Sequence, residues 1–175
     1  MLEAADDIVE GAKVILKILG INKCLIGIEN NKPEAIKAMT AAAEAASTPE
    51  FQISVQALQV KYPQGSEKQL IQTLTGRKVP AFALPSAVGV VVHNVSTTKA
   101  IYDAAVLGKP LYEKIVTISG KGIKRPANLR VRVGTRISDI VDHLGGVTPE
   151  LSKIIMGGPM MGFAVSSLDI PVTKT

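Results

Sequence analysis

The chain has few of the residues that soft-metal and nucleic-acid sites need: no Trp, one Cys, two His, three Phe and three Tyr among 175 residues. Proteins that bind single-stranded nucleic acid stack bases on aromatic side chains, so this composition argues against a nucleic-acid partner. The lone Cys24 excludes an intrachain disulfide, and with His93 and His143 it falls short of the about four soft ligands of a zinc or iron–sulfur site. We predict no metal site and interpret Cys24 as a small buried apolar residue.

Formal charge is missing from Val79 to Thr98, a stretch long enough to cross a bilayer. Pro80, Pro85 and Gly89 interrupt it, and no basic leader region precedes it. The pattern therefore predicts a soluble chain without a transmembrane segment.

The first half of the chain alternates helical and strand patterns. Gly20 is typical of a helix C-terminus and Pro33 of a first helical turn. In the second strand we expect Ile53 and Val55 to face inward, with Leu58 as a third candidate. The predicted elements are helix 5–19, strand 24–28, a turn at 30–31, helix 33–46, strand 51–60, a helix ending at Gly76, strand 89–92 and a helix over about 96–107. This alternation predicts an α/β fold with a parallel sheet.

After Pro110 the pattern changes to that of a small α+β module. Leu129, Val131 and Val133 alternate with Arg130 and Arg132, which is typical of a half-buried strand. The predicted elements are strands 112–118 and 128–134 joined by a turn at 120–122, a short helix 137–144, and strands 154–156 and 163–165.

Two loops open predicted helices, where unpaired backbone N–H groups and the helix dipole favour an anion. The first runs from Lys61 to Lys68; Ser66 and Gln69 have the spacing of a capping box, and Gly65 would permit close approach of a ligand. An ordinary cap explains this loop equally well. A phosphate-bearing cofactor is the functional alternative.

The second loop runs from Val91 to Thr98, with His93 and Asn94 at the end of the predicted strand 89–92. Open α/β sheets bind ligands at the carboxyl ends of their strands, which makes these side chains binding candidates. The structural alternatives are a hydrogen-bonded core histidine for His93 and a helix cap for Asn94.

Charge is uneven along the chain. Lys109 to Arg136 holds eight basic residues and one acid, Glu113, whereas residues 1–60 hold eight acids and five bases. Solvated strand faces explain this basic cluster. The functional alternative is docking to an acidic partner or to anionic lipid headgroups.

Four ordered motifs carry a resemblance to the C subunit of the ion-translocating Rnf electron transport complex, and the resemblance runs the length of the chain. The motifs are Lys61-Tyr-Pro-Gln-Gly-Ser-Glu-Lys-Gln-Leu-Ile71, Gly89-Val-Val-Val-His-Asn-Val-Ser-Thr-Thr-Lys-Ala-Ile-Tyr102, Gly108-Lys-Pro-Leu-Tyr112 and Gly157-Gly-Pro-Met-Met-Gly162, and Pro171-Val-Thr-Lys174 supports them. The two loops also resemble, more distantly, the Tyr-x-x-Gly-Glu-Glu and Asn-Asn-Val-Glu-Thr patterns of the flavin-binding subunit of respiratory complex I. Ser66, His93 and Ser96 depart from those patterns.

The resemblance implies a parent protein that takes hydride from NADH onto FMN and passes electrons through two 4Fe-4S clusters toward ferredoxin. It implies a truncated Rossmann-like flavin-binding domain over residues 1–110 and a β-grasp domain of the soluble-ligand-binding (SLBB) type over 111–175. Carried over by position, Gly65 and Ser66 would line a phosphate, Glu67 would face the nicotinamide ribose, and Asn94 and Thr97 would contact the flavin. The predicted cofactor-binding set is Tyr62, Gly65, Ser66, Glu67, Val92, His93, Asn94 and Thr97, in which His93 is our own addition because it departs from the family pattern.

In that family a Gly-rich flavin loop precedes the matching region and the cluster cysteines follow it. We therefore expect no catalytic residue in this chain alone and weak or absent FMN binding by it. The implied partners are the other subunits of a membrane complex and, indirectly, ferredoxin. The implied place is peripheral, on the cytoplasmic face of the bacterial inner membrane.

Two alternatives remain. The related cobalamin reductase of propanediol metabolism shares the architecture, although its second loop would be closer to Asn-Val-Glu-Thr than the sequence at 93–97. A non-catalytic docking scaffold is the other, with both loops serving only as helix caps.

Overall fold

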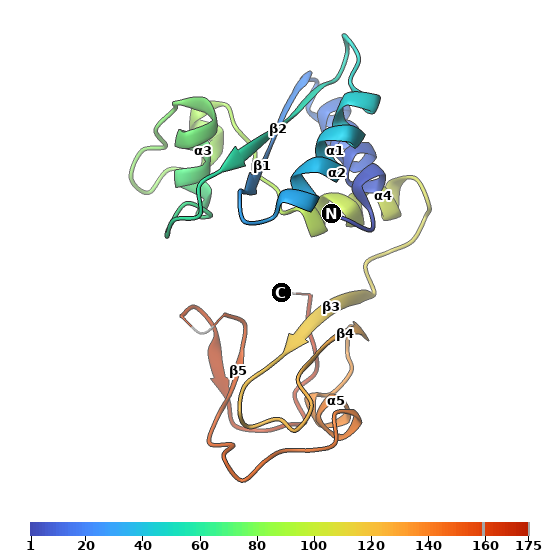
Figure 1. Cartoon of the computed structure of the whole chain (residues 1–175), viewed down its shortest axis with the longest axis vertical. Helices are drawn as coiled ribbons and strands as arrows, with labels where there is room; N and C mark the ends of the chain where they lie inside the picture. The colour runs from blue at the N-terminus through green and yellow to red at the C-terminus, as the bar shows by residue number, and fades with distance from the viewer. Residues whose placement is uncertain (159, 175) are drawn as a thin grey trace. The chain divides into compact units, whose positions relative to one another are not determined.

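The computed structural model describes residues 1–158 and 160–174 and divides into two compact units, Met1–Pro110 and Leu111–Thr175 (Figure 1). Within the described residues, no helix combines the length and the apolar character needed to cross a membrane.

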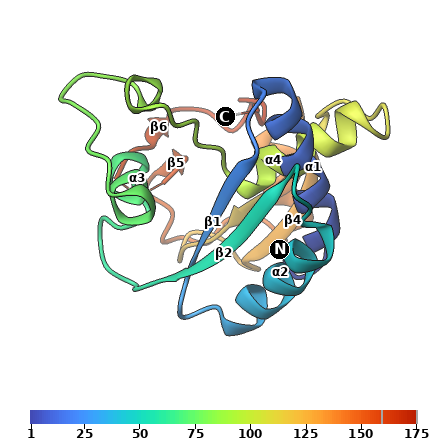
Figure 2. The same ribbon diagram turned by 90° about the horizontal axis from the view of Figure 1, so that it is seen from above.

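The first unit is an α/β arrangement around two parallel strands. Its elements are α1 (Ala5–Leu19), β1 (Lys23–Glu29), α2 (Pro33–Ala46), β2 (Gln52–Leu58), α3 (Glu67–Thr75), the 3-10 helix η1 (Pro85–Val88) and α4 (Val95–Ala105). β1 and β2 pair in parallel from Lys23 opposite Gln52 to Glu29 opposite Leu58. Figures 1 and 2 show α1, α2 and α4 on one side of these strands and α3 on the other. The predicted α/β fold and its parallel pairing are confirmed.

The core of the first unit lies between the strands and helices α1 and α2. Met39 of α2 has no exposed surface and Val9 of α1 is 1% exposed, and they pack with Ile26, Ile28 and Ile53 of the strands. Alternate strand residues point to one face, so these three isoleucines share the face that the two helices cover.

The opposite face of the strands packs against α3 at Gly27. A Cβ placed there would lie 2.8 Å from Leu58 Cδ1 and 2.9 Å from Leu70 Cδ1. Leu58 is therefore buried, as expected, but on the α3 face rather than with Ile53 and Val55, because it is an odd number of residues from both.

The predicted strand 89–92 is wrong. Residues 90–94 have no regular secondary structure; they follow η1 and Gly89, whose φ is 67°. An apolar run indicates burial but supplies no pairing partner, and within the described residues β1 pairs only with β2. The second loop thus begins from an irregular segment.

The described residues of the second unit form two antiparallel strand pairs and one helix. Its elements are β3 (Glu113–Ile118), β4 (Ala127–Arg132), α5 (Ile137–His143), β5 (Ile154–Met156) and β6 (Phe163–Val165). β3 pairs with β4 and β5 with β6, and Val131, Ile140, Leu144 and Val172 form the core. Arg130 and Arg132 are exposed on the outer face of β4. The predicted hairpin, short helix and last two strands are confirmed.

Candidate functional site

The first loop follows β2, at the carboxyl end of the parallel strands. Gln64 N donates to Lys61 O at 2.6 Å and Ser66 N donates to Pro63 O at 2.8 Å, so two turns deliver the chain to α3. Gln64 Nε2 also donates to Thr73 Oγ1 at 2.8 Å, which ties the loop to the helix that follows. This is the edge of an open α/β sheet at which ligands bind.

The predicted capping box at Ser66 is wrong. Ser66 is the N-cap residue by position, with φ −70° and ψ 144°, but its side chain makes no capping hydrogen bond. The helix instead begins with the backbone bond from Leu70 N to Ser66 O at 2.9 Å. The first-turn N–H groups of α3 and the Ser66 hydroxyl are consequently left for another acceptor, as an anion site requires.

Gly65 stands beside this open helix end with free space around it. A Cβ placed on Gly65 would meet no atom within 4 Å, and its φ is not in the left-handed region. The backbone conformation therefore does not itself demand glycine. Tyr62, Ser66 and Glu67 are exposed around the same turn, with 81% of Tyr62 accessible.

The second loop is built differently, because Asn94 caps α4. Asn94 Oδ1 accepts from Ser96 N at 2.9 Å, and Asn94 O accepts from Thr98 N at 3.0 Å and from Thr98 Oγ1 at 3.2 Å. The cap alternative for Asn94 is thus confirmed. This helix end is closed by its own side chain, whereas the first-turn end of α3 is open.

The remaining predicted residues of the second loop differ in burial. His93 and Thr97 are exposed and Val92 is half-buried. The core-histidine alternative for His93 is therefore wrong.

No hydrogen bond or ion pair joins the predicted residues of the first loop to those of the second in the part of the chain that the structure describes. The connection runs instead through α3: Lys68 Nζ donates to Pro80 O at 3.0 Å, and Arg77 Nη1 donates to Val88 O at 2.8 Å. No motif in the sequence points to Arg77 or Lys68 as contacts of this kind. The Gly76–Arg77 junction indicates only the end of a helix.

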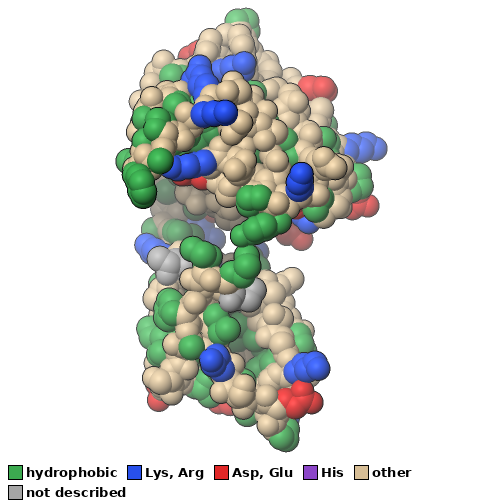
Figure 3. Space-filling view, turned by 90° about the vertical axis from the view of Figure 1, so that its left-hand side faces the viewer, with side chains coloured by type: hydrophobic (Ala, Val, Ile, Leu, Met, Phe, Trp, Pro, Cys, Tyr) green, Lys and Arg blue, Asp and Glu red, His purple; other side chains and the backbone are tan. Residues whose placement is uncertain are grey.

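Charge around the first loop favours an anion. Residues 60–94 contain four bases and one acid, Glu67. Figure 3 shows Lys and Arg side chains on the side of the first unit that carries α3. Lys61 and Lys68 are the bases of the loop itself, whereas Arg77 and Lys78 lie beyond the opposite end of α3 and are not part of the anion site.

One aromatic residue near the loops was not singled out by the sequence. Phe82 has a fully exposed side chain and φ 60°, an unusual backbone conformation for a bulky residue. Leu84, two residues later, is 73% exposed. The segment between α3 and η1 therefore presents apolar surface to solvent.

Away from both loops, Lys99 of α4 bridges to α1. Its Nζ lies 2.7 Å from Asp103 Oδ1 and 3.5 Å from Asp7 Oδ2. The hydrogen bond to Asp103 raises the pKa of Lys99, so the ammonium stays charged. This pair helps to hold α4, and with it the second loop, against α1.

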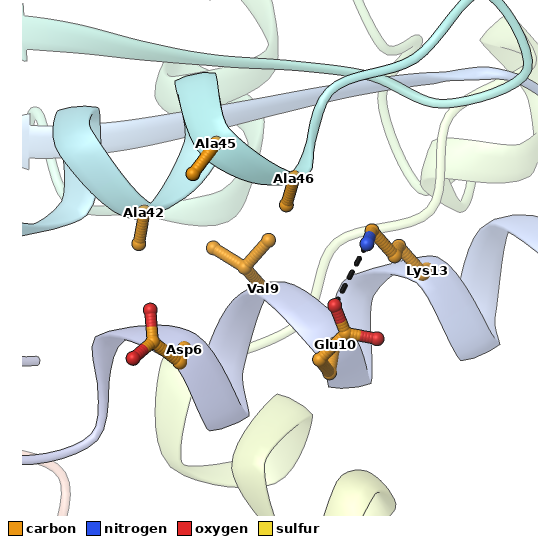
Figure 4. Close-up of a pocket in the computed structure, with 7 residues that line it drawn as sticks. All are labelled: Asp6, Val9, Glu10, Lys13, Ala42, Ala45 and Ala46. Carbon is orange, nitrogen blue, oxygen red and sulfur yellow. Dashed lines mark hydrogen bonds and ion pairs between the residues drawn. The ribbon is translucent and has the colours of Figure 1, made fainter.

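The cavity of about 240 Å³ in Figure 4 lies between α1 and α2, remote from these loops in the chain. Two of its charged lining residues already form an ion pair with each other, since Lys13 Nζ lies 2.7 Å from Glu10 Oε1. Among the described residues no group of three His, Cys, Asp or Glu side chains could hold a metal ion. The lining residues are Asp6, Val9, Glu10, Lys13, Ala42, Ala45 and Ala46.

Cys24 packs against the core of the first unit, and burial raises the pKa of its thiol. We expect iodoacetamide at pH 8 to alkylate the folded chain at least about ten-fold more slowly than the urea-unfolded chain, because only the exposed thiolate reacts quickly. Mass spectrometry of quenched samples measures both rates. Because the folded pKa is the higher one, stability is unaffected below the unfolded value, about 8.5, and falls as pH rises above it. The structure leaves Cys24 half-buried rather than fully buried, and equal alkylation rates in the two states would contradict that placement.

Known protein families match both units of the chain. The family model of the Nuo51 FMN-binding domain matches residues 1–103, and that of the SLBB domain matches residues 115–164. The chain is similar over 97% of its length to a solved NAD+-reducing NiFe-hydrogenase in the air-oxidized state, with TM-score 0.73 and 18% identity, and covers 34% of that chain. At this identity the likeness supports the fold.

Curated relatives are closer in sequence. The C subunit of the proton-translocating ferredoxin:NAD(+) oxidoreductase complex of Clostridium ljungdahlii is 52% identical over 99% of the chain, which spans 37% of that relative. The Na(+)-translocating counterpart of Acetobacterium woodii is 42% identical over 99% of the chain, which spans 38% of it. The C subunit of the ion-translocating oxidoreductase complex of Rhodobacter capsulatus is 42% identical, again over 99% of the chain and 33% of the relative.

These relatives confirm the resemblance to the C subunit of the Rnf complex, and the α/β unit followed by an SLBB match confirms the expected fold class. The chain belongs to the family of the Nuo51 FMN-binding domain, and its homologues are C subunits of ion-translocating oxidoreductase complexes.

Proposed function

We propose that this chain forms the FMN- and NADH-binding part of the C subunit of an ion-translocating ferredoxin:NAD+ oxidoreductase. Residues 1–110 bind FMN and NADH, and residues 111–175 form the SLBB domain. In the whole protein, electrons pass from NADH through FMN and 4Fe-4S clusters toward ferredoxin, at the cytoplasmic face of the membrane. One observation carries the proposal: the uncapped first turn of α3, beside Gly65, within the region that the FMN-binding family model matches.

The residues of the first loop fit a phosphate-bearing cofactor. The free N–H groups of α3 and the Ser66 hydroxyl supply donors, and Lys61 and Lys68 supply positive charge nearby. The open space at Gly65 lets a ligand approach the backbone. Gly65 and Ser66 therefore line the phosphate.

Other residues of the predicted set take the remaining contacts. Glu67, exposed at the start of α3, accepts from hydroxyl groups of the nicotinamide ribose. Asn94 Oδ1 already accepts from Ser96 N, and its amide N–H groups are the donors it offers to the flavin. Thr97, His93, Val92 and Tyr62 complete the surface around them. Bound flavin supplies the exchange between two-electron and one-electron chemistry.

The test separates cofactor binding from folding in the full-length protein. We expect Gly65→Val to lower FMN affinity about ten-fold or more, because the added side chain occupies the approach to the backbone. Thermal unfolding should stay unchanged, because a Cβ there meets no protein atom within 4 Å. Flavin fluorescence quenching measures affinity, and calorimetry measures stability.

Glu67→Gln in the same protein distinguishes the nicotinamide side from the flavin side. We expect kcat/KM for NADH to fall about ten-fold or more with FMN content retained, because a charged acceptor is lost from one ligand only. Glu44→Gln, at an exposed acid of α2, is the matched control. Equal loss of FMN and NADH turnover would overturn the assignment of Glu67, and wild-type FMN content in Gly65→Val would overturn the site.

A further inference from the structure

Arg77 connects the helix of the first loop to the segment that leads into the second. It follows Gly76, the left-handed residue with φ 72° that ends α3. Its Nη1 donates to Val88 O at 2.8 Å and to Gly89 O at 3.5 Å. Val88 is the last residue of η1 and Gly89 is its C-cap, so the guanidinium occupies the carbonyl end of that helix, where a cation is favoured.

This contact matters because no strand holds the second loop. Residues 90–94 lack regular structure and have no sheet partner among the described residues. Downstream they are fixed by the Asn94 cap and by α4, which packs against α1. Upstream, the contacts nearest Val92 and His93 along the chain are the hydrogen bond from Val90 N to Pro85 O at 3.3 Å and, just before it, the two carbonyls that Arg77 holds.

Figure 2 shows the light-green segment that carries η1 running from α3 toward α4. The hydrogen bonds of Arg77 join the two ends of this segment, since they link the residue after Gly76 to residues eleven and twelve positions later. The first loop leads directly into α3, and Arg77, just after α3, holds the segment that leads into the second loop. The position of α3 therefore affects both loops. A second hydrogen bond, from Lys68 Nζ to Pro80 O, holds the start of the same segment against α3.

We infer that Arg77 is a positioning residue: by holding Val88 and Gly89 it sets the place of Val92 and His93 relative to the Tyr62–Glu67 turn, and thereby the FMN affinity of the site. The inference rests on the proposed function for its ligand. Arg77 is exposed and does not belong to the buried core, so its role is local rather than global. It needs no contact with the cofactor.

The experiment compares three variants of the full-length protein. We expect Arg77→Met to weaken FMN binding about ten-fold, with the unfolding temperature kept, because loss of two charged hydrogen bonds frees an exposed segment. Arg77→Lys should recover most of the affinity, since an ammonium can still donate to one of the carbonyls. Lys78→Met is the matched control, because it removes the adjacent exposed charge and should bind FMN as the wild type does.

Hydrogen exchange of the amides of residues 90–93 gives a readout independent of FMN. We expect these amides to exchange faster in Arg77→Met and at the wild-type rate in Lys78→Met. Wild-type FMN affinity in Arg77→Met, or an affinity loss matched by Lys78→Met, would overturn the inference. Failure of the wild-type protein to bind FMN would instead overturn the proposed function, while the exchange data would still decide whether Arg77 positions the segment.

Discussion

Replacement of Met39 by alanine is expected to lower the free energy of unfolding of the first unit by about 2–5 kcal/mol. Met39 lies on α2, has no exposed surface, and belongs to the cluster that contains Val9, Ile26 and Ile53. Its removal takes a large apolar side chain out of a close-packed interior and leaves a cavity that the neighbouring helices can only partly fill.

Urea denaturation of the 175-residue chain, followed by far-ultraviolet circular dichroism, measures this loss, because four of the five α-helices described lie in the first unit. Met39→Leu conserves volume and should cost less than about 1.5 kcal/mol. Lys37→Ala, at an exposed position of the same helix, should stay within about 0.5 kcal/mol of the wild type. If Met39→Ala were as mild as Lys37→Ala, α2 would not pack on the strands as described.

Gly11→Ala should destabilise the same unit by about 1–3 kcal/mol, although alanine is ordinarily the better helix residue by about 0.5–1 kcal/mol. A Cβ on Gly11 of α1 would overlap the backbone carbonyl of Thr98 in α4. Backbone atoms cannot rotate away as a side chain does, so α4 has to shift. Because Thr98 N and Oγ1 both donate to Asn94 O, that shift also moves the second loop.

The same urea titration measures the loss of stability, and the double variant Gly11→Ala with Thr98→Ala supplies the control. The Thr98 methyl is farther from the added Cβ, at 3.3 Å, than the carbonyl oxygen is. Truncation of that side chain should therefore not restore stability. Full rescue by Thr98→Ala, or a Gly11→Ala variant more stable than the wild type, would show that the helices do not meet through their backbones here.

Local pattern predicted most of the secondary structure. The ends of α1 and α2 and the strands β5 and β6 lie where Gly20, Pro33 and the short apolar runs indicated. These signals are local, since a left-handed glycine or a first-turn proline acts within one helical turn. The two errors of secondary structure and capping concern tertiary context: the strand expected at 89–92 had no partner among the described residues, and Ser66 had the spacing of a capping box without its hydrogen bond.

The candidate site divides along the same line. The motifs at 61–71 and 89–102 were sufficient to indicate the family, because the order of residue types in a motif can be recognised without knowing which atoms those residues contact. The structure then separated two loops that looked alike. The α3 end is uncapped, the α4 end is capped by Asn94, and Arg77 links α3 to the segment before the second loop.

By itself the sequence determined the alternation of helices and strands, the antiparallel hairpin of the second unit, the scarcity of metal ligands and the family resemblance. These follow from residue types and spacings, which are properties of neighbouring positions in the chain. Only the tertiary structure decided which helix end stays open, which face of β2 buries Leu58, and what holds residues 90–94 in place. Each of those depends on which atoms meet across a packed interface, and a hydrogen bond or a steric overlap changes within less than an ångström of displacement.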